Sequence, residues 1–154
     1  MSRAFVKETD AESIEVLPDR PISPHPNFVT PAGLAAMERD LAALDDARAA
    51  AVRTSDAAEM ARIDRELRYW TARRASAQLV PAPDHPQTVQ FGVTVTLARG
   101  DGRRQTFRIV GEDEADPAHG TLSHVSPLAR ALFGKAVGDV VAVGGGEAEI
   151  LGIG

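Results

Sequence analysis

Two acidic side chains, Asp56 and Glu59, have the residue type and spacing in this sequence that best suit chemistry. They lie three positions apart at the start of a predicted helix, so their carboxylates share one face of it. Two carboxylates on a projecting tip could share a divalent cation with the active site of a partner. The structural alternative, which the sequence alone favours, is that acids in a first helical turn stabilise the helix dipole.

Other site chemistries are poorly supported by the sequence. The chain has no cysteine and four scattered histidines, which excludes thiolate nucleophiles, disulfides and zinc–thiolate sites and argues against a built-in metal or cofactor. Residues 113–116 spell the helicase tetrapeptide DEAD, but the sequence has no phosphate-binding loop. The glycines at 144–146 precede no helix and predict a hairpin turn. We therefore expect no active site of the protein's own, so it is not an enzyme by itself.

Charge and hydropathy limit the partners of the chain. Its 154 residues carry 17 basic and 22 acidic side chains, a net charge of −5, which argues against a protein that coats nucleic acid by itself. A protein partner is more plausible. No stretch approaches the roughly 18 apolar residues of a membrane span, and the N-terminus lacks the apolar core of a signal peptide. We expect a cytoplasmic monomer that does not bind membranes.

The elements that would position the acidic pair begin after a proline-rich arm. Four prolines in residues 1–29 predict an extended segment. Thr30 and Pro31 predict a helix N-cap and a first helical residue, and apolar residues then recur at spacings of three and four to about Arg53. Gly33 is the weak point of this helix.

A second amphipathic helix follows a short turn. Its apolar stripe comprises Met60, Ile63, Leu67 and Trp70, and Arg74 takes the next stripe position. Two such helices can bury their stripes only against each other, so residues 30–80 predict an antiparallel α-hairpin that packs as a coiled coil. We expect Leu67 and Trp70 to hold the two helices together and to face the linker.

The C-terminal half has the pattern of a sheet. Residues 81–86 contain three prolines and predict a linker, and residues 87–154 change to a period of two. The predicted strands are 91–97, 105–110, 139–143 and 149–153, and Ser126 with Pro127 opens a short helix to Leu132. The chain is therefore predicted to be α+β, a helical hairpin followed by a strand-rich unit.

Several of these segments together resemble the bacterial Gre transcript cleavage and elongation factors. The segments are IVGEDEAD at 109–116, SPLARALFGK at 126–135, Gly138 with Asp139, Phe91 with Gly92, and FVTPAGL at 28–34. The resemblance runs from about Phe28 to Ile153. The segment IDRELRY at 63–69 is more similar to the GreB branch than to the GreA branch.

The resemblance implies how the two parts act. The hairpin would enter the secondary channel of RNA polymerase, and residues 87–154 would form an FKBP-like antiparallel β domain with one short helix that docks on the channel rim. Contact with RNA and DNA would be indirect, within the elongation complex. The polymerase-binding residues expected on this basis are Asp113, Glu114, Asp116, Ser126, Pro127 and Leu128.

The sequence departs from the family pattern at the tip. Met60 stands where the family has asparagine after the acidic pair, and the hairpin is shorter by about one or two heptads per arm, which withdraws the tip by about 10–20 Å. We therefore expect a GreB-like regulator of transcription elongation that binds polymerase and has no chemistry of its own. One alternative is a cleavage-stimulating factor in which Asp56 and Glu59 help to hold the polymerase's second Mg²⁺. Another is a regulator of a different protein, such as nucleoside diphosphate kinase. Peptidyl-prolyl isomerase activity is not expected, because a fold does not carry a function.

Overall fold

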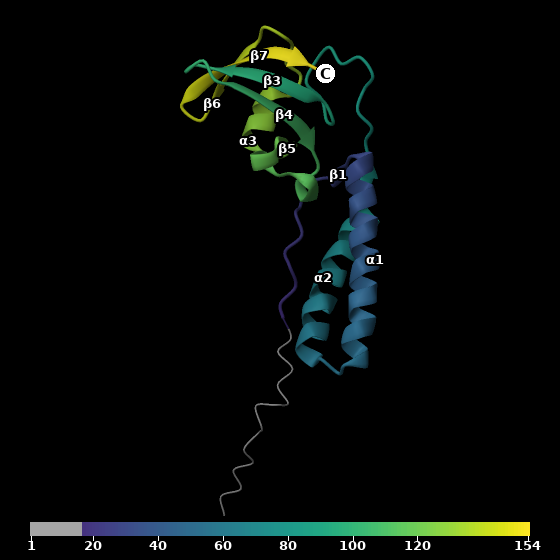
Figure 1. Cartoon of the computed structure of the whole chain (residues 1–154). Helices are drawn as coiled ribbons and strands as arrows, with labels where there is room; N and C mark the ends of the chain where they lie inside the picture. Colours follow the sequence, from purple (N-terminus) through teal and green to yellow (C-terminus); the bar gives the residue numbers. More distant parts are fainter. Residues whose placement is uncertain (1–16) are drawn as a thin grey trace, which may run out of the picture.

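A two-helix hairpin projects from a five-stranded sheet in the computed structural model of this chain (Figure 1). The structure describes residues 17–154, so the prediction of an extended arm over residues 1–16 lies outside the described residues. The predicted α+β class is confirmed. No helix among residues 17–154 is long and apolar enough to cross a membrane.

The first helix, α1 (Pro31–Arg53), begins and ends where the sequence predicts. The Thr30 hydroxyl accepts a hydrogen bond from the backbone N–H of Gly33 at 3.0 Å, and Pro31 occupies the first helical turn, where a backbone donor is not needed. After a short turn the chain reverses into α2 (Ala57–Ser76). The two helices lie side by side and antiparallel, with the turn that joins them at the far end from the sheet (Figure 1).

The contact between the helices buries one narrow stripe. Ile63 is fully buried, and Met37 and Ala51 are 3% and 5% exposed. Leu67 is only half-buried, as expected for two helices with no third layer over them. The stripe position assigned to Arg74 was wrong: Arg74 is exposed, and its neighbour Arg73 is 1% exposed.

Trp70 lies at the base of the hairpin. It is half-buried. It lines a cavity of about 60 Å³ together with Val29 before α1, Gly33 and Met37 of α1, and Asp113 of the sheet region. Its ring also makes an edge contact with the ring of Tyr69 at 5.1 Å between centroids. The fluorescence of Trp70 should therefore be sensitive to the contact between the hairpin and the sheet region.

The sheet is mixed rather than purely antiparallel, which corrects the prediction. Its strands are β3 (Thr94–Arg99), β4 (Arg104–Val110), β5 (Thr121–Ser123), β6 (Val140–Val143) and β7 (Gly146–Ile153), in the order β5-β4-β3-β7-β6. Strands β3, β4, β6 and β7 pair antiparallel, whereas β5 pairs parallel with β4. Residues 111–120 separate β4 from β5 and bring Thr121 back beside Arg108, so that β5 runs in the same direction along the last three residues of β4.

The sheet region has its own core. Val95, Leu97, Ile109 and Ile150 are fully buried on one face of the sheet, and α3 (Pro127–Leu132) covers that face with Leu132, which is also fully buried. Inward positions of β3 alternate with half-buried ones, as the period of two predicts. The predicted hairpin turn at 144–146 is confirmed, because Gly144 and Gly145 both adopt positive φ between β6 and β7.

Two very short strands join the ends of the hairpin to each other. β1 (Phe28–Val29) precedes α1 and pairs parallel with β2 (Gln78–Leu79), which follows α2. Two 3₁₀ turns, η1 (Glu112–Glu114) and η2 (Pro117–His119), fill the connection between β4 and β5. Turn η1 contacts β1, so the acidic segment faces the base of the hairpin.

Candidate functional site: the hairpin tip and the acidic turn

The two acids predicted to do chemistry both lie at the exposed hairpin tip, and both are engaged locally. The Asp56 carboxylate accepts a hydrogen bond from the Glu59 backbone N–H at 3.1 Å and so caps α2. The two oxygens of Glu59 accept hydrogen bonds from Arg62 Nε and Nη2 at 2.9 and 2.6 Å. This hydrogen-bonded guanidinium lowers the pKa of the Glu59 carboxyl below its ordinary value. Both acids lie at the start of α2, as the structural alternative requires, and each has a local hydrogen-bond partner.

No metal centre accompanies the tip. Within residues 17–154, no three His, Asp or Glu side chains are grouped closely enough to hold a metal ion. Since Asp56 and Glu59 alone supply at most part of a coordination shell, any ion there would need ligands from a partner.

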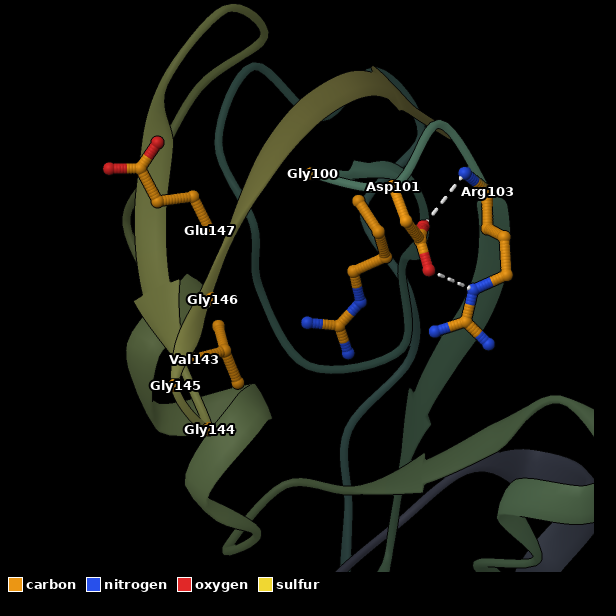
Figure 2. A pocket seen from close by; sticks show the side chains of 9 residues that line it. Gly100, Asp101, Arg103, Val143, Gly144, Gly145, Gly146 and Glu147 are labelled. Carbon is orange, nitrogen blue, oxygen red and sulfur yellow. Dashed lines mark hydrogen bonds and ion pairs between the residues drawn. The ribbon is translucent and has the colours of Figure 1, made fainter.

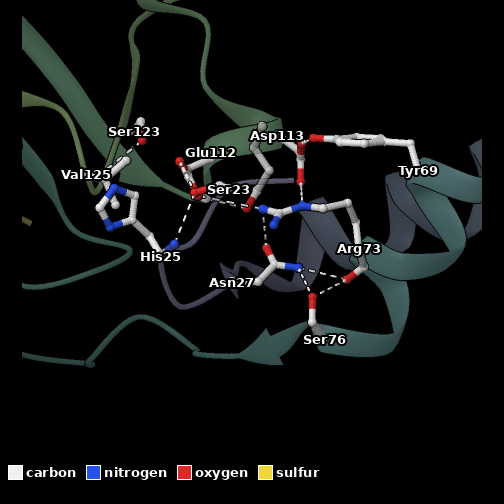
Figure 3. Close-up of polar contacts among 12 residues, drawn as sticks. Ser23, His25, Asn27, Tyr69, Arg73, Ser76, Glu112, Asp113, Ser123 and Val125 are labelled. Atoms are coloured by element: carbon white, nitrogen blue, oxygen red, sulfur yellow. Dashed lines mark hydrogen bonds and ion pairs between the residues drawn. The ribbon is translucent and has the colours of Figure 1, made fainter. Parts of the chain in front are cut away.

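The acidic turn η1 makes the polar contacts between hairpin and sheet (Figure 3). Asp113 accepts from the Tyr69 hydroxyl with one carboxylate oxygen and from Arg73 Nε at 2.6 Å with the other. Glu112 lies 3.7 Å from a terminal nitrogen of Arg73. Two acids of the sheet region thus face one guanidinium of α2.

Arg73 is a buried charge, and two other segments neutralise or hydrogen-bond it. Besides Asp113, it donates from Nη2 to Oδ1 of Asn27 at 2.8 Å, and Asn27 Nδ2 donates back to the Arg73 carbonyl at 2.7 Å. Asn27 itself is 4% exposed. A guanidinium removed from water is tolerated only when its charge and its N–H groups find partners, so Arg73, Asp113 and Asn27 form one unit.

Glu114 reaches the other helix of the hairpin. Its carboxylate accepts from the Thr30 backbone N–H at 3.0 Å and from the Gly111 N–H at 3.1 Å, and it also bonds the Thr30 hydroxyl. The negative charge therefore lies at the N-terminus of α1, where the helix dipole favours it. Gly33 lies beneath this carboxylate, and a Cβ at Gly33 would overlap it. Gly33 lowers the helix propensity of α1, and its missing side chain leaves the space in which the Glu114 carboxylate reaches the Thr30 N–H.

The contact between the acidic turn and the base of the hairpin is the joint of the molecule. Two titratable rings near this joint have shifted pKa values. Burial, and then the hydrogen bond to Asp113, raise the pKa of Tyr69 to about 12. Burial lowers the pKa of His124 below its ordinary value of 6.5. The His124 ring packs against Phe28 and Phe91, with centroids 5.2 and 5.6 Å away, which explains the loss of solvation.

The six residues expected to bind polymerase do not form one surface. Asp113 and Glu114 are held in the joint, Ser126 caps α3 by accepting from the Ala129 N–H at 3.2 Å, and Leu128 is 9% exposed in the sheet core. Asp116 and Pro127 are exposed, and Asp116 lies 2.6 Å from Nδ1 of His119.

An open cleft that the sequence did not indicate lies between two turns of the sheet region (Figure 2). It measures about 410 Å³ and lies between residues 99–103 and residues 143–147. Asp101 pairs with Arg103 at 2.6 Å, and the carboxylate of Glu147 points away from the cleft in Figure 2. Most of the charge at this cleft is therefore either neutralised by a neighbour or directed elsewhere.

Comparison with known proteins defines the class to which this fold and acidic turn belong. Residues 83–153 match the family described as "Transcription elongation factor, GreA/GreB, C-term". GreB of Pasteurella multocida is 34% identical over 136 residues, which cover 76% of this chain and 86% of that protein. The chain belongs to the GreA/GreB family of transcription elongation factors.

Two further relatives show the extent of the similarity. GreB of Neisseria meningitidis serogroup A is 45% identical over 100 residues, and the match spans about 61% of the length of each protein. Among solved structures, Gfh1 of Thermus thermophilus is 21% identical, with a TM-score of 0.42 over 84% of this chain and 99% of that chain.

Proposed function

We propose that this chain is a regulator of transcription elongation that binds RNA polymerase at the secondary channel. In this proposal the sheet region docks on the channel rim and the hairpin inserts. Family membership supports the partner, and the shape supports the mode: α1 has 23 residues and is about 35 Å long, with its tip away from the sheet (Figure 1).

The engagement of both tip acids is the observation that carries the rest of the proposal. One oxygen of Asp56 caps α2, and both oxygens of Glu59 bond Arg62. A Mg²⁺ ligand must present an oxygen at about 2.0–2.1 Å in octahedral geometry, whereas both oxygens of Glu59 face the Arg62 guanidinium, whose positive charge repels a cation. The tip therefore fits poorly as a source of metal ligands, and we infer that the protein occupies the channel without stimulating RNA cleavage.

A cleavage-stimulating role for Asp56 and Glu59 is the second candidate. Its support is that the pair Glu59–Arg62 is exposed, with 41% and 56% of the side chains accessible to solvent. Exposed ion pairs are weak, so a polymerase-bound ion could compete for Glu59.

Direct contact with the rim is proposed for Asp116 and Pro127, the two exposed members of the expected docking set.

A backtracked elongation complex with labelled RNA separates the two candidates. We expect the full chain to bind the complex, to leave the RNA uncut, and to slow cleavage stimulated by an added GreB as its concentration rises. The tip variant Asp56→Asn/Glu59→Gln should behave the same way. Its matched control is Asp45→Asn/Asp46→Asn, two exposed acids of α1. Rapid cleavage by the parent that is lost only in the tip variant would establish the second candidate instead.

A further inference from the structure

The N-terminal segment 17–27 crosses both parts of the molecule. On α2, the Pro18 carbonyl accepts from Arg65 Nε at 2.7 Å and Asp19 pairs with Arg68 at 2.6 Å. On the sheet region, the Ser23 hydroxyl donates to Glu112 at 3.0 Å. The segment therefore connects the side of the hairpin to the acidic turn, in addition to the covalent linker 81–86.

Arg20 contacts the hairpin in two ways. Its Nη1 donates to Glu66 at 2.7 Å, and its guanidinium carbon lies 3.8 Å from the centre of the Tyr69 ring. Both interactions act at once, because the ring face attracts the cation while the carboxylate pairs with it. Tyr69 in turn donates to Asp113, so the contact leads directly to the joint.

The segment ends at the buried Arg73. Asn27 accepts from the Arg73 guanidinium, and its own amide donates to the Arg73 carbonyl and to the Ser76 hydroxyl at 2.7 and 3.1 Å (Figure 3). Asn27 thus hydrogen-bonds the last turn of α2 and is the second hydrogen-bond partner of the Arg73 guanidinium, after Asp113. The segment is anchored at one end by the buried Asn27 and along its length by exposed and half-buried pairs.

The composition and length of the segment suit it to hold the hairpin and the sheet region together. Residues 18–27 contain four prolines, so little backbone entropy is lost on ordering. The nine steps from residue 18 to residue 27 span up to about 28 Å in an extended chain. The facing stretch of α2 from Arg65 to Ser76 rises only about 16 Å. The excess length lets the segment leave the helix and reach Glu112 before it returns to Asn27.

We propose that residues 17–27 form a strap that fixes the direction of the hairpin relative to the sheet region. Arg73 is the positioning residue on which the strap, α2 and the acidic turn converge. Under the proposed function, on which the consequence for binding rests, the strap keeps the hairpin aligned with the channel while the sheet region holds the rim.

Distance measurements between two introduced spin labels test the strap without any partner. The chain has no cysteine, so Ala49→Cys on α1 and Ala142→Cys on β6, both exposed positions, can be labelled cleanly. We expect one narrow distance distribution in the parent and a broader one in Asp19→Ala/Arg20→Ala/Ser23→Ala. The matched control Arg39→Ala/Asp84→Ala/Thr71→Ala also removes one arginine, one aspartate and one hydroxyl, all from exposed residues outside the strap, and should keep the narrow distribution.

Binding to core RNA polymerase is then measured on the same variants. If the aligned direction falls to about one third of the population, apparent affinity should fall about threefold in the strap variant and not in the control. An unchanged distance distribution in the strap variant overturns the strap. A broadened distribution with unchanged affinity overturns its role in binding. A parent that does not bind polymerase refutes the proposed function and leaves the distance result standing, so the two failures are distinguishable. Circular dichroism verifies that each variant is folded.

Discussion

The carboxylate of Glu114 lies over the α-carbon of Gly33, in space that any other residue's Cβ would fill. Through this contact an acid of the sheet region caps the first helix of the hairpin, together with Thr30. The same turn binds the second helix through Asp113 and Arg73. The acidic turn is thus the joint between the hairpin and the sheet region.

Replacing Gly33 by alanine should destabilise the protein, although helix propensity predicts the opposite. Alanine gains up to about 1 kcal/mol over glycine within a helix. The new methyl group would displace Glu114 from the Thr30 N–H, and a charge-assisted hydrogen bond contributes about 1.5–3 kcal/mol. We expect a net loss of about 1 kcal/mol in the free energy of unfolding, measured in urea by the fluorescence of Trp70, the sole tryptophan.

A double-mutant cycle supplies the control for Gly33. In a Glu114→Ala background the obstruction is gone, so Gly33→Ala should become neutral or stabilising. If Gly33→Ala stabilises the parent chain as well, Glu114 does not occupy this space in solution.

Arg73→Ala should be far more damaging than Arg74→Ala. Removing Arg73 leaves Asp113 without its ion-pair partner in a largely buried site, and breaking such a pair typically costs about 3–5 kcal/mol. Arg74 pairs with Glu38 on the surface, where about half of each side chain is exposed, and its loss should cost at most about 1 kcal/mol. Thermal unfolding of the two variants gives the comparison. Equal losses would contradict the burial of Arg73.

Stability should fall as pH drops below about 6.5, the ordinary pKa of histidine. His124 has a lowered pKa in the folded chain because of burial, so the unfolded chain takes up the proton first and is favoured by acid. The contribution is complete above pH 6.5 and is lost as pH falls toward the folded-state pKa. His124→Phe, which keeps the ring against Phe28 and Phe91, should flatten the dependence of unfolding free energy on pH between 7 and 5. An equally steep dependence in this variant would exclude His124 as the cause.

Tyr69 should ionise only near pH 12. It is the sole tyrosine, so the ultraviolet absorbance of phenolate reports it alone. Because the folded pKa is raised, the stability from this group is present below pH 10 and is lost as pH rises above it. Asp113→Asn removes the charge beside the hydroxyl, and the pKa should fall but stay above 10 because burial persists. Titration of the parent near pH 10 would mean that Tyr69 is neither buried nor in contact with Asp113.

The sequence alone determined the local elements of this protein. The N-caps Thr30 and Ser126, each followed by proline, begin helices where the pattern predicts, and the turn at 144–146 has the predicted conformation. These features succeed because they depend on backbone preferences within a few residues. The position of Asp56 at the start of α2, on which the structural alternative depends, is local in the same sense.

Only the tertiary structure decided what the acidic turn does and which arginine is buried. Periodicity placed Arg74 on the stripe, but the partners of Arg73 come from positions 46 residues earlier and 40 residues later. Glu114 and Thr30 are 84 residues apart, and no local pattern connects them. The short strand β5 was missed for the same reason, since three residues show no period and its parallel pairing with β4 depends on the connection between them. Contacts between distant segments are fixed by the packing of the two parts together, and a single sequence does not reveal that packing.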